Sequence, residues 1–469
     1  MAPAVMWFRR DLRLEDHPAS AAAAASSRDG VVPLFVLDPY LLDRAGPNRR
    51  RFLAESLAAL DQGLGGTLVL RHGRPDRVVP SVAAEVGAEV VACTADFAPY
   101  GRARDETVAK ALRDRGSQLL RVGSPYAVTP GTVRTASGGP CRVFTSYRRA
   151  WEAIGWPVPD PELDVEFVGA TSDANLGDLR AWPPHSHNGV PKWWEGLPLG
   201  PAANLPPAGT TAAWERLERF VAGPLASYAI ERDRPGVSGT SGLSPHLRFG
   251  SIHPRTVLHL LGTYSGAERL RNELAWREFY ADVLWHRPDS ARRPLQRFGD
   301  HLRWDAGDRA QERFRAWATG ATGYPLVDAG MRQLLAEGWM HNRVRMVTAS
   351  FLVKDLHIDW RWGARWFMWH LVDGDLASNQ QGWQWVVGTG TDAAPFHRIL
   401  NPRVQQERFD PDDRYVLRYL GDAASSSVAP IVDHGSERRE TLTRFEEARE
   451  LARNTRPAGE VPPVRRHPR

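Results

Sequence analysis

A loop rich in glycine and hydroxyl groups is the first place where this sequence could bind a ligand. Residues 239–245 read Gly-Thr-Ser-Gly-Leu-Ser-Pro and precede a helical stretch. Backbone N–H groups and hydroxyls at the start of a helix bind phosphate, because that end of the helix dipole is positive. The alternative is that Ser244 only caps the helix that Pro245 begins. Since the loop by itself favours the capping interpretation, a phosphate site requires supporting residues elsewhere.

Two helical faces supply candidate partners for such a ligand. Each places three side chains at positions i, i+3 and i+4, namely Glu273, Trp276 and Arg277 on one face and Asn342, Arg345 and Met346 on the other. This spacing makes the three side chains neighbours on one side of a helix. A solvated ion-pair face and a helix buried on one side are the alternative interpretations. Tryptophan and methionine are unusual choices for a solvated face, which favours a binding role.

The stretch 373–385 (DGDLASNQQGWQW) combines carboxylate and amide groups with apolar neighbours on both sides. Burying so many polar groups costs free energy unless partners satisfy them, so the stretch predicts a bound polar ligand. We expect no metal ion, because Asp373 and Asp375 lack the further oxygen ligands of a calcium loop and the sequence has neither HExxH nor a cysteine ligand set. The sequence also carries no signature of the common hydrolases, P-loop proteins or kinases.

The first 125 residues contain the strands that must position part of this chemistry. Five apolar runs are predicted strands, at 4–8, 31–37, 67–70, 89–94 and 118–122, and helices are predicted between them at 51–60, 77–86 and 106–115. This alternation predicts an α/β domain with a doubly wound, five-stranded parallel sheet of Rossmann-like type. No GxGxxG follows the first strand, where the chain reads Trp7-Phe8-Arg9-Arg10-Asp11, so a conventional dinucleotide site is not expected there.

The rest of the chain changes character twice. Residues 157–211 are rich in Pro, Gly, Asn and Ser and predict an irregular connector over the surface. Beyond them, helices are predicted at 212–222, 267–285, 311–317, 325–337, 341–354, 362–373 and 436–454, and the last dozen residues are predicted to fray. We therefore expect an α/β domain over 1–135, a linker over 136–211 and an all-α domain over 212–469.

Composition narrows the class of protein. The 469 residues carry a net charge of +5, and only three of the 60 basic residues are lysines, which makes nucleic acid one candidate partner. Of the 18 tryptophans, 11 lie between residues 276 and 385, so an aromatic core or an aromatic function is needed there. Two cysteines, and no apolar run of membrane-spanning length, predict a cytoplasmic chain with reduced thiols and no membrane association.

Six blocks of this sequence together resemble the photolyase/cryptochrome family. They are residues 7–14 (WFRRDLRL), the loop at 240–244, residues 273–280 (ELAWREFY), 338–355 (GWMHNRVRMVTASFLVKD), 373–385 and 389–402 (TGTDAAPFHRILNP). Their length, their order and their spread over most of the chain argue against chance. Within the family, the chain is similar to the class I cyclobutane pyrimidine dimer (deoxyribodipyrimidine) photolyases.

The resemblance implies that the helical domain binds FAD, active as FADH⁻, in a U shape beneath a cavity for a pyrimidine dimer flipped out of DNA. It implies phosphate contacts from Tyr228, Thr240, Ser241, Leu243 and Ser244. It implies contacts to the flavin and adenosine parts from Arg277, Asn342, Arg345, Asp373 and Asp375. Asn379 would lie opposite the flavin N5, where a neutral amide is compatible with an anionic reduced flavin.

The resemblance also implies the substrate and the reaction. UV-damaged DNA, single- or double-stranded, is the expected partner, and its dimer would face Glu273, Trp276, Asn342, Met346 and Trp385. The photoexcited reduced flavin donates an electron to the dimer, the cyclobutane ring splits and the electron returns. The cofactor supplies this chemistry, so Glu273, Asn342, Met346 and Asn379 would assist without an acid/base pair. Trp383, Trp360 and Trp304 match the family's tryptophan chain, through which oxidised FAD is photoreduced.

Three other functions compete with dimer repair. The (6-4) photolyases would carry histidines where this chain has Asn342 and Met346. A cryptochrome photoreceptor shares the FAD and the tryptophans, but often has a long C-terminal extension and a different residue opposite N5, so Asn379 favours repair. A nucleic-acid-binding flavoprotein without repair activity rests on charge alone. The chain departs from the family at Ser378, Gln380 and Gln381, and it lacks a segment that many members carry after Tyr419.

An antenna chromophore is a further expectation. Residues 35–39 (FVLDP) and 99–105 (PYGRARD) resemble deazaflavin-binding relatives more than folate-binding ones. We therefore expect 8-hydroxy-5-deazaflavin in contact with Asp38, Arg49 and Asp105, with methenyltetrahydrofolate as the alternative. A third possibility is that these are ordinary strand ends and helix caps with no chromophore.

The expected DNA interaction is with phosphates, since no groove-reading motif is present. Arg343 and Arg403 are the candidate phosphate contacts, and binding should depend steeply on salt with little sequence preference beyond adjacent pyrimidines. We expect the protein to act as a monomer.

Overall fold

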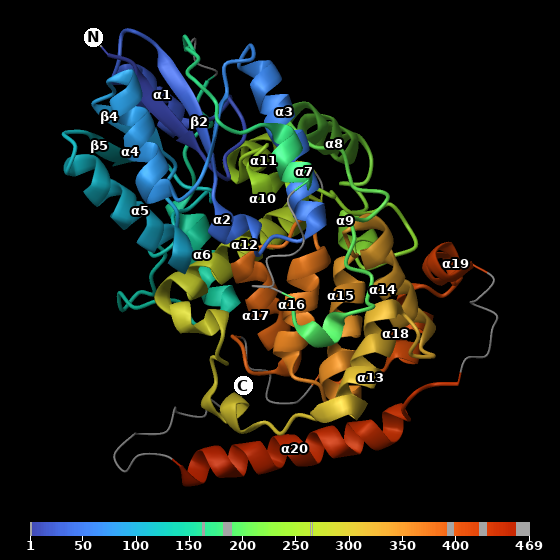
Figure 1. Ribbon diagram of the computed structural model, residues 1–469. Coiled ribbons are helices and arrows are strands. Elements are labelled where there is room, and N and C mark those ends of the chain that lie inside the picture. Colours follow the sequence, from blue (N-terminus) through green and yellow to red (C-terminus); the bar gives the residue numbers. More distant parts are fainter. Residues whose placement is uncertain are drawn as a thin grey trace.

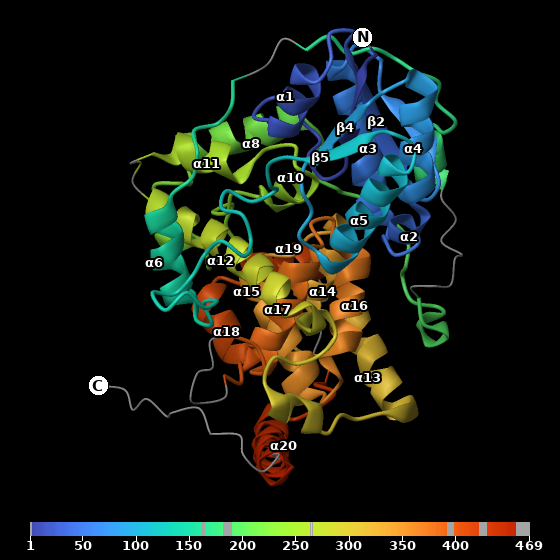
Figure 2. The same ribbon diagram turned by 90° about the vertical axis from the view of Figure 1, so that its left-hand side faces the viewer.

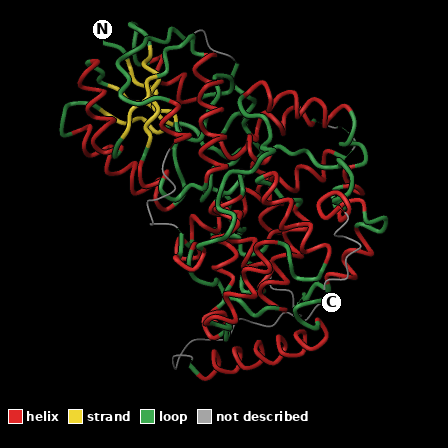
Figure 3. Tube along the Cα trace, turned by 45° about the vertical axis from the view of Figure 1, so that its right-hand side comes forward, coloured by secondary structure: helices red, strands yellow, loops and turns green. Residues whose placement is uncertain are grey.

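The computed structural model describes residues 2–161, 165–181, 190–262, 264, 266–391, 398–421 and 429–455. An α/β part near the N-terminus lies against a larger helical part, as Figures 1 and 3 show. Three predicted features fall wholly or partly outside these residues: the Pro-rich stretch after Ala181, the middle of the 389–402 block and the C-terminal end predicted to fray.

The predicted five-stranded parallel sheet is confirmed. Its strands are β1 (Ala4–Phe8), β2 (Val31–Leu37), β3 (Val69–His72), β4 (Val90–Cys93) and β5 (Gln118–Arg121), and they lie in the order β3-β2-β1-β4-β5. The central strand β1 is buried along its whole length, which explains its continuous apolar sequence. The order reverses between β1 and β4, so the residues that follow these two strands flank the crevice where doubly wound sheets bind ligands.

Helices cover both faces of the sheet (Figures 1 and 2). Apolar residues of α1 (Pro18–Ala25) and α3 (Pro47–Gly63) pack on one face with Met6 and Phe35, and those of α4 (Pro75–Val86) and α5 (Pro99–Arg113) pack on the other with Trp7 and Leu34. The short helix α2 (Pro39–Leu42) follows β2. The helices predicted here were correct in place, although α3 is longer than predicted at both ends and α5 begins earlier.

The described residues of the Pro-rich stretch at 157–211 include two short elements, α7 (Leu176–Ala181) and the 3₁₀ turn η1 (Lys192–Trp194). Helix α6 (Phe144–Ile154) precedes that stretch, within the predicted linker. In α7 and η1 one apolar side chain is fully buried, Leu179 and Trp194 respectively. Single anchors of this kind leave no periodic pattern in a sequence, so a composition-based prediction misses them. The domain boundaries stay predictions.

The helical part is built mainly of α8 (Thr210–Ala222), α9 (Tyr228–Glu231), α10 (Ser244–Phe249), α11 (Pro254–Leu261), α12 (Ala267–His286), α13 (Gly307–Thr319), α14 (Pro325–Glu337), α15 (Asn342–Ser350), α16 (Trp360–His370), α17 (Leu376–Val387), α18 (Pro402–Phe409), α19 (Arg414–Leu420) and α20 (His434–Asn454). Short 3₁₀ turns, η2 (Pro288–Ala291) and η3 (Arg297–His301), follow α12. Helix α20 lies along the edge of the molecule (Figure 1). The helix predicted at 341–354 ends at Ser350 and continues as a π-helical turn, η4 (Phe351–Asp355).

Buried polar contacts join the two parts. Asp16 of the α/β part pairs with Arg255 and accepts a hydrogen bond from Thr256 Oγ1 at 2.6 Å. Gly250 ends α10 in the left-handed region (φ 72°), and a Cβ there would overlap the backbone of Arg10. The residues after β1 are therefore pressed against the start of the helical part. No described helix is long and apolar enough to cross a membrane.

Candidate cofactor and substrate site

A turn at residues 373–375 gathers the predicted cofactor residues. The Asp373 Oδ2 atom accepts hydrogen bonds from Ser244 Oγ at 2.6 Å and from the Arg345 guanidinium at 2.9 Å. Trp339 Nε1 donates to the same serine hydroxyl at 3.2 Å. The other oxygen, Asp373 Oδ1, is buried and has no hydrogen-bond partner among the described residues. A buried carboxylate oxygen needs a partner, so this atom indicates a polar group of a bound ligand.

The glycine-hydroxyl loop leads into this cluster. Ser244 is the first residue of α10 and makes no capping hydrogen bond, so the capping interpretation was wrong. Instead its hydroxyl points to Asp373, as a ligand-site residue would. Arg216 holds the loop from outside by donating from Nε to the Ser241 carbonyl at 2.7 Å, and Gly242 (φ 63°) has no room for a Cβ because of that guanidinium. Thr240 and Leu243 complete the loop.

Asp375 connects this turn to the α/β part. Its carboxylate accepts from the Ser378 N–H at 3.1 Å, which caps α17, and from the Arg10 guanidinium at 3.1 Å. Burial by itself would raise the pKa of Asp375, but Arg10, Arg248 and Arg277 hold that pKa well below its ordinary value. The start of α17 is therefore fixed by an ionised carboxylate that faces both parts of the molecule.

Two further predicted cofactor residues, Arg277 and Tyr228, lie on α12 and at the start of α9. Arg277 donates to the carbonyls of Pro125 and Leu247 at 3.2 and 3.1 Å, so part of its guanidinium is already used by the backbone. Tyr228 is buried at the start of α9. Burial raises the pKa of this tyrosine to about 12, so its hydroxyl is neutral.

The two predicted lesion-facing indoles each have one face covered. Trp276 on α12 stacks on Phe144, with ring centroids 3.7 Å apart and ring planes 8° apart. Trp385 on α17 lies under the Arg398 guanidinium, 4.9 Å from its ring centroid. Both indoles are half-buried, and α12 packs against α17. Each indole is thus held by a neighbour, an aromatic ring for Trp276 and a guanidinium for Trp385.

The remaining predicted substrate residues lie on α12, α15 and α18. Glu273 forms an ion pair with Arg232, so its carboxylate is already oriented. Asn342 is exposed at the start of α15, and Met346 is half-buried one turn later. Arg343 pairs with Asp233 at 3.0 Å, and Arg403 is exposed at the start of α18.

Asn379 lies in the first turn of α17 and is tied to α16. Its Nδ2 atom donates to the Ala364 carbonyl at 3.1 Å and to Gln380 Oε1 at 2.9 Å. The glutamines that depart from the family pattern have partners here: Gln380 donates to the Ala291 carbonyl at 2.6 Å and Gln381 to Ser290 Oγ at 2.8 Å. These residues therefore fasten α17 to η2.

Of the three tryptophans predicted to carry electrons, Trp383 lies on α17, Trp360 begins α16 and Trp304 lies in the loop before α13. The Trp383 ring occupies the place where a Cβ of Gly363 would be, and Gly363 follows Trp360 by one turn of α16. The backbone N–H of Asp305 donates to the His357 carbonyl at 2.8 Å, which brings Trp304 next to the residues before Trp360. Trp383 and Trp360 are buried, whereas Trp304 is half-buried. The order therefore leads from the interior towards solvent.

A second site lies at the carboxyl ends of the strands, between the two parts of the molecule. It is a cavity of about 760 Å³ whose lining includes Asp38, Arg49, Arg248 and Asp375. Asp105 does not line this cavity; it borders a neighbouring hollow and pairs with Arg9 at 2.5 Å and with Arg104 at 2.9 Å.

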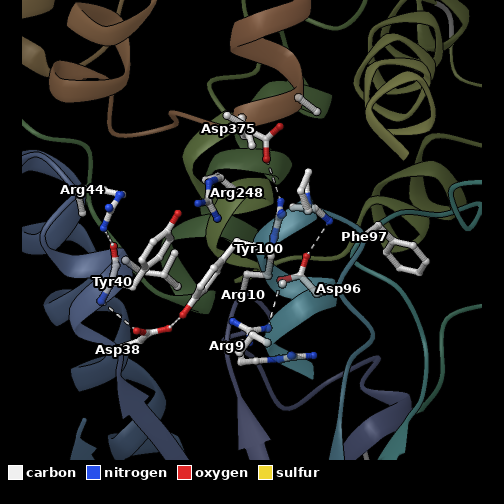
Figure 4. Close-up of a pocket in the computed structure, with 18 of the residues that line it drawn as sticks. Arg9, Arg10, Asp38, Tyr40, Arg44, Asp96, Phe97, Tyr100, Arg248 and Asp375 are labelled. Atoms are coloured by element: carbon white, nitrogen blue, oxygen red, sulfur yellow. Dashed lines mark hydrogen bonds and ion pairs between the residues drawn. The ribbon is translucent and has the colours of Figure 1, made fainter. Parts of the chain in front are cut away.

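An aromatic pair forms one wall of the cavity, as Figure 4 shows. Tyr40 and Tyr100 are stacked with ring centroids 4.1 Å apart, and the Tyr100 hydroxyl donates to Asp38. Burial raises the pKa of Asp38, although the Tyr100 hydrogen bond opposes this. Burial lowers the pKa of Arg49 to about 9. An apolar, partly charged cavity of this size suits a planar organic chromophore.

Several residues of these sites escaped prediction. Arg216, Arg232 and Arg398 each act on a partner at least 13 residues away in the sequence, so spacing could not reveal them. Arg9 and Arg10 follow the first strand directly, and their position at the sheet's carboxyl edge was a usable signal. Among the described residues, no group of three or more potential metal ligands occurs.

Comparison with known proteins agrees with this arrangement. Residues 4–164 match the family model for DNA photolyase, and residues 270–447 match the model for the FAD binding domain of DNA photolyase. The deoxyribodipyrimidine photo-lyase of Agrobacterium fabrum is 36% identical, over 95% of this chain and 98% of the relative.

Solved structures are similar over nearly the whole chain. A bacterial class III photolyase from Agrobacterium tumefaciens has a TM-score of 0.84 and 35% identity, covering 96% of this chain and 98% of that one. An archaeal photolyase from Sulfolobus tokodaii with two FAD molecules has a TM-score of 0.80 and 27% identity, covering 95% and 99%. The class I assignment stays a prediction. The fold, the two sites and these relatives together show that the chain belongs to the photolyase/cryptochrome family.

Proposed function

We propose that this protein is a light-driven DNA repair enzyme, a deoxyribodipyrimidine photo-lyase that splits cyclobutane pyrimidine dimers with the help of FAD. The observation that carries this proposal is the cluster of Ser244, Arg345 and Asp373, in which the buried Asp373 Oδ1 has no hydrogen-bond partner among the described residues.

The donor set around Asp373 fits FAD. The loop at 240–244 offers hydroxyls and backbone N–H groups for the phosphates, and Arg277, Arg345, Asp375 and Asn342 would hold the rest of the molecule with Asp373. Tyr228 would close the phosphate side. When bound and reduced, FAD supplies the photoexcited electron that splits the cyclobutane ring.

The residues of this chain orient the cofactor and the dimer. Asn379, fixed by Ala364 and Gln380, presents a neutral amide towards the flavin, which avoids placing a second negative charge there. The free faces of Trp276 and Trp385 stack on the flipped-out bases. Glu273, held by Arg232, accepts a hydrogen bond from a base of the dimer. Asn342 and Met346 contact the dimer from α15.

Two arginines near the proposed dimer site bind phosphates of the DNA backbone. Arg343 and Arg403 are the proposed phosphate contacts, and the net charge of +5 supports an anionic partner. Arg343 would exchange its partner Asp233 for a phosphate.

The cavity between the two parts is the proposed antenna site. Its stacked tyrosines, with Asp38 and Arg49, would hold 8-hydroxy-5-deazaflavin, and methenyltetrahydrofolate is the alternative. Asp105 would act there only through its partners Arg9 and Arg104. The Sulfolobus tokodaii photolyase carries a second FAD, so a flavin-type chromophore has a precedent among similar structures.

Dimer repair tests the proposed function. An oligonucleotide with a thymine dimer should lose the lesion when it is illuminated with blue light in the presence of the reduced protein, and should keep it in the dark. Trp276→Ala should weaken dimer binding by about 1–3 kcal/mol, because one base loses its stacking partner. Chromatography of the digested oligonucleotide measures the loss of the dimer, and a binding titration measures the affinity of the variant for the dimer. Intact dimers after illumination of the reduced protein would contradict repair and favour a photoreceptor.

Photoreduction tests the tryptophan chain. Trp383→Phe should leave oxidised FAD unreduced under blue light with an external reductant, because phenylalanine is far harder to oxidise than tryptophan. The same variant should still repair dimers after chemical reduction with dithionite. Trp156→Phe, which alters a half-buried tryptophan of the connector, serves as the control. If FAD in the Trp383→Phe variant is photoreduced at the parent's rate, Trp383 does not take part in electron transfer.

The absorption spectrum of protein purified from its native source tests the antenna. It should show a deazaflavin band in addition to the flavin bands, and Asp38→Ala should lose the deazaflavin band while it keeps the FAD. A folate spectrum instead would overturn the deazaflavin assignment, and the absence of any second chromophore would overturn the antenna site.

A further inference from the structure

Lys354 stands out in a chain that uses arginine almost everywhere else. The sequence has only three lysines, and of these Lys110 and Lys192 are exposed whereas Lys354 is 1% exposed. Lys354 lies in η4, the π-helical turn after α15, and such turns occur frequently at functional sites. A buried ammonium group is costly unless it is well paired. Its partner should therefore explain why it is there.

The ammonium group holds a backbone carbonyl of the segment before α18. Lys354 Nζ donates to the Arg398 carbonyl at 2.5 Å. Two residues later, the Leu400 N–H donates to Ser350 Oγ at 3.3 Å, so the end of α15 and η4 bind this segment at two points. The Lys354 carbonyl in turn accepts from Thr441 Oγ1 of α20, which fixes the turn from the opposite side.

Burial and two neighbouring charges, those of Asp355 and Arg398, act on the pKa of Lys354 in different directions. Burial lowers the pKa of Lys354 to about 7, Asp355 raises it, and Arg398 lowers it further. Asp355 itself pairs with His434 through Oδ1 at 2.5 Å. Among the described residues, the hydrogen-bond partner of the Lys354 ammonium group is the Arg398 carbonyl.

The Arg398 side chain leads from this anchor to the substrate site. Arg398 is exposed, yet its guanidinium lies 4.9 Å from the ring centroid of Trp385. A guanidinium over an indole is favourable and keeps the ring in one orientation. An unanchored backbone at Arg398 would let this contact and the indole move together.

We propose that Lys354 is a positioning residue for dimer recognition, which acts through the Arg398 carbonyl to keep the Arg398 guanidinium on Trp385. The inference rests on the proposed function, because Trp385 matters only if its free face stacks on a base. Lys354 does not touch the dimer. It fixes one of the two indoles that do, whereas Phe144 fixes the other by direct stacking.

Binding titrations with matched variants test this proposal. Lys354→Met keeps the length of the side chain and removes the donor. It should raise the Kd for a dimer-containing oligonucleotide by up to about tenfold, since one hydrogen bond to a charged group sets the upper limit of the effect. Its Kd for the undamaged oligonucleotide should stay unchanged, because the exposed charge of Arg398 remains. Lys110→Met, which removes an exposed lysine, should bind both oligonucleotides like the parent.

A double variant separates positioning from a general structural role. Arg398→Ala should also lose affinity for the dimer, and adding Lys354→Met to it should cause little further loss, because the side chain that Lys354 positions is gone. Flavin content and photoreduction should be unchanged in all variants. Full additivity of the two losses, or a Lys354→Met protein that keeps the parent's preference for dimers, would overturn the proposal.

Two further measurements complete the test. If Lys354→Met fails to fold, the Arg398→Ala variant is tested by itself, since it changes an exposed residue. An Arg398→Ala protein with the parent's preference for dimer-containing DNA would overturn the proposal. The parent must bind and repair the dimer in the same series. A parent that does not repair contradicts the proposed function, whereas a repairing parent with unaffected variants contradicts only the role of Lys354.

Discussion

Two buried carboxylates in the turn at 373–375 set the geometry on which both sites depend. Charges removed from water are tolerated only when they are paired and hydrogen-bonded. Ser244 and Arg345 bind the Oδ2 atom of Asp373, and Arg10 and the first turn of α17 bind Asp375. The turn can therefore form only when α10, α15 and the end of β1 meet. Helix α17, which carries Asn379, Trp383 and Trp385, is fixed in consequence.

This turn also lies between the two proposed chromophore sites. Asp375 lines the cavity beside the sheet, while Asp373 faces the glycine-hydroxyl loop. Gly374 has no room for a side chain because Arg49, a cavity residue, approaches it closely. The turn thus contributes one carboxylate to each of the two proposed sites.

Much of the fold followed from the sequence because its signals are local. All five strands were predicted from short apolar runs, and α14 was predicted to the residue. Helical spacing and family motifs also placed the predicted site residues on three helices, and the structure has those residues on α12, α15 and α17. The parts that escaped prediction depend on contacts between distant segments. Arg232 meets Glu273 and Arg398 meets Trp385 only in the folded chain, and α7 and η1 are held by single buried side chains.

The flavin content of a purified Asp373→Ala protein tests the central claim most directly, with Asp114→Ala, a change at an exposed ion pair on the α/β part, as the control. Circular dichroism establishes that both variants fold. We predict that Asp373→Ala folds but retains little FAD and repairs no dimers under blue light, because Ser244 and Arg345 lose the carboxylate that orients them. An Asp373→Ala protein with a full complement of FAD and the parent's repair activity would contradict the placement of the cofactor at this turn.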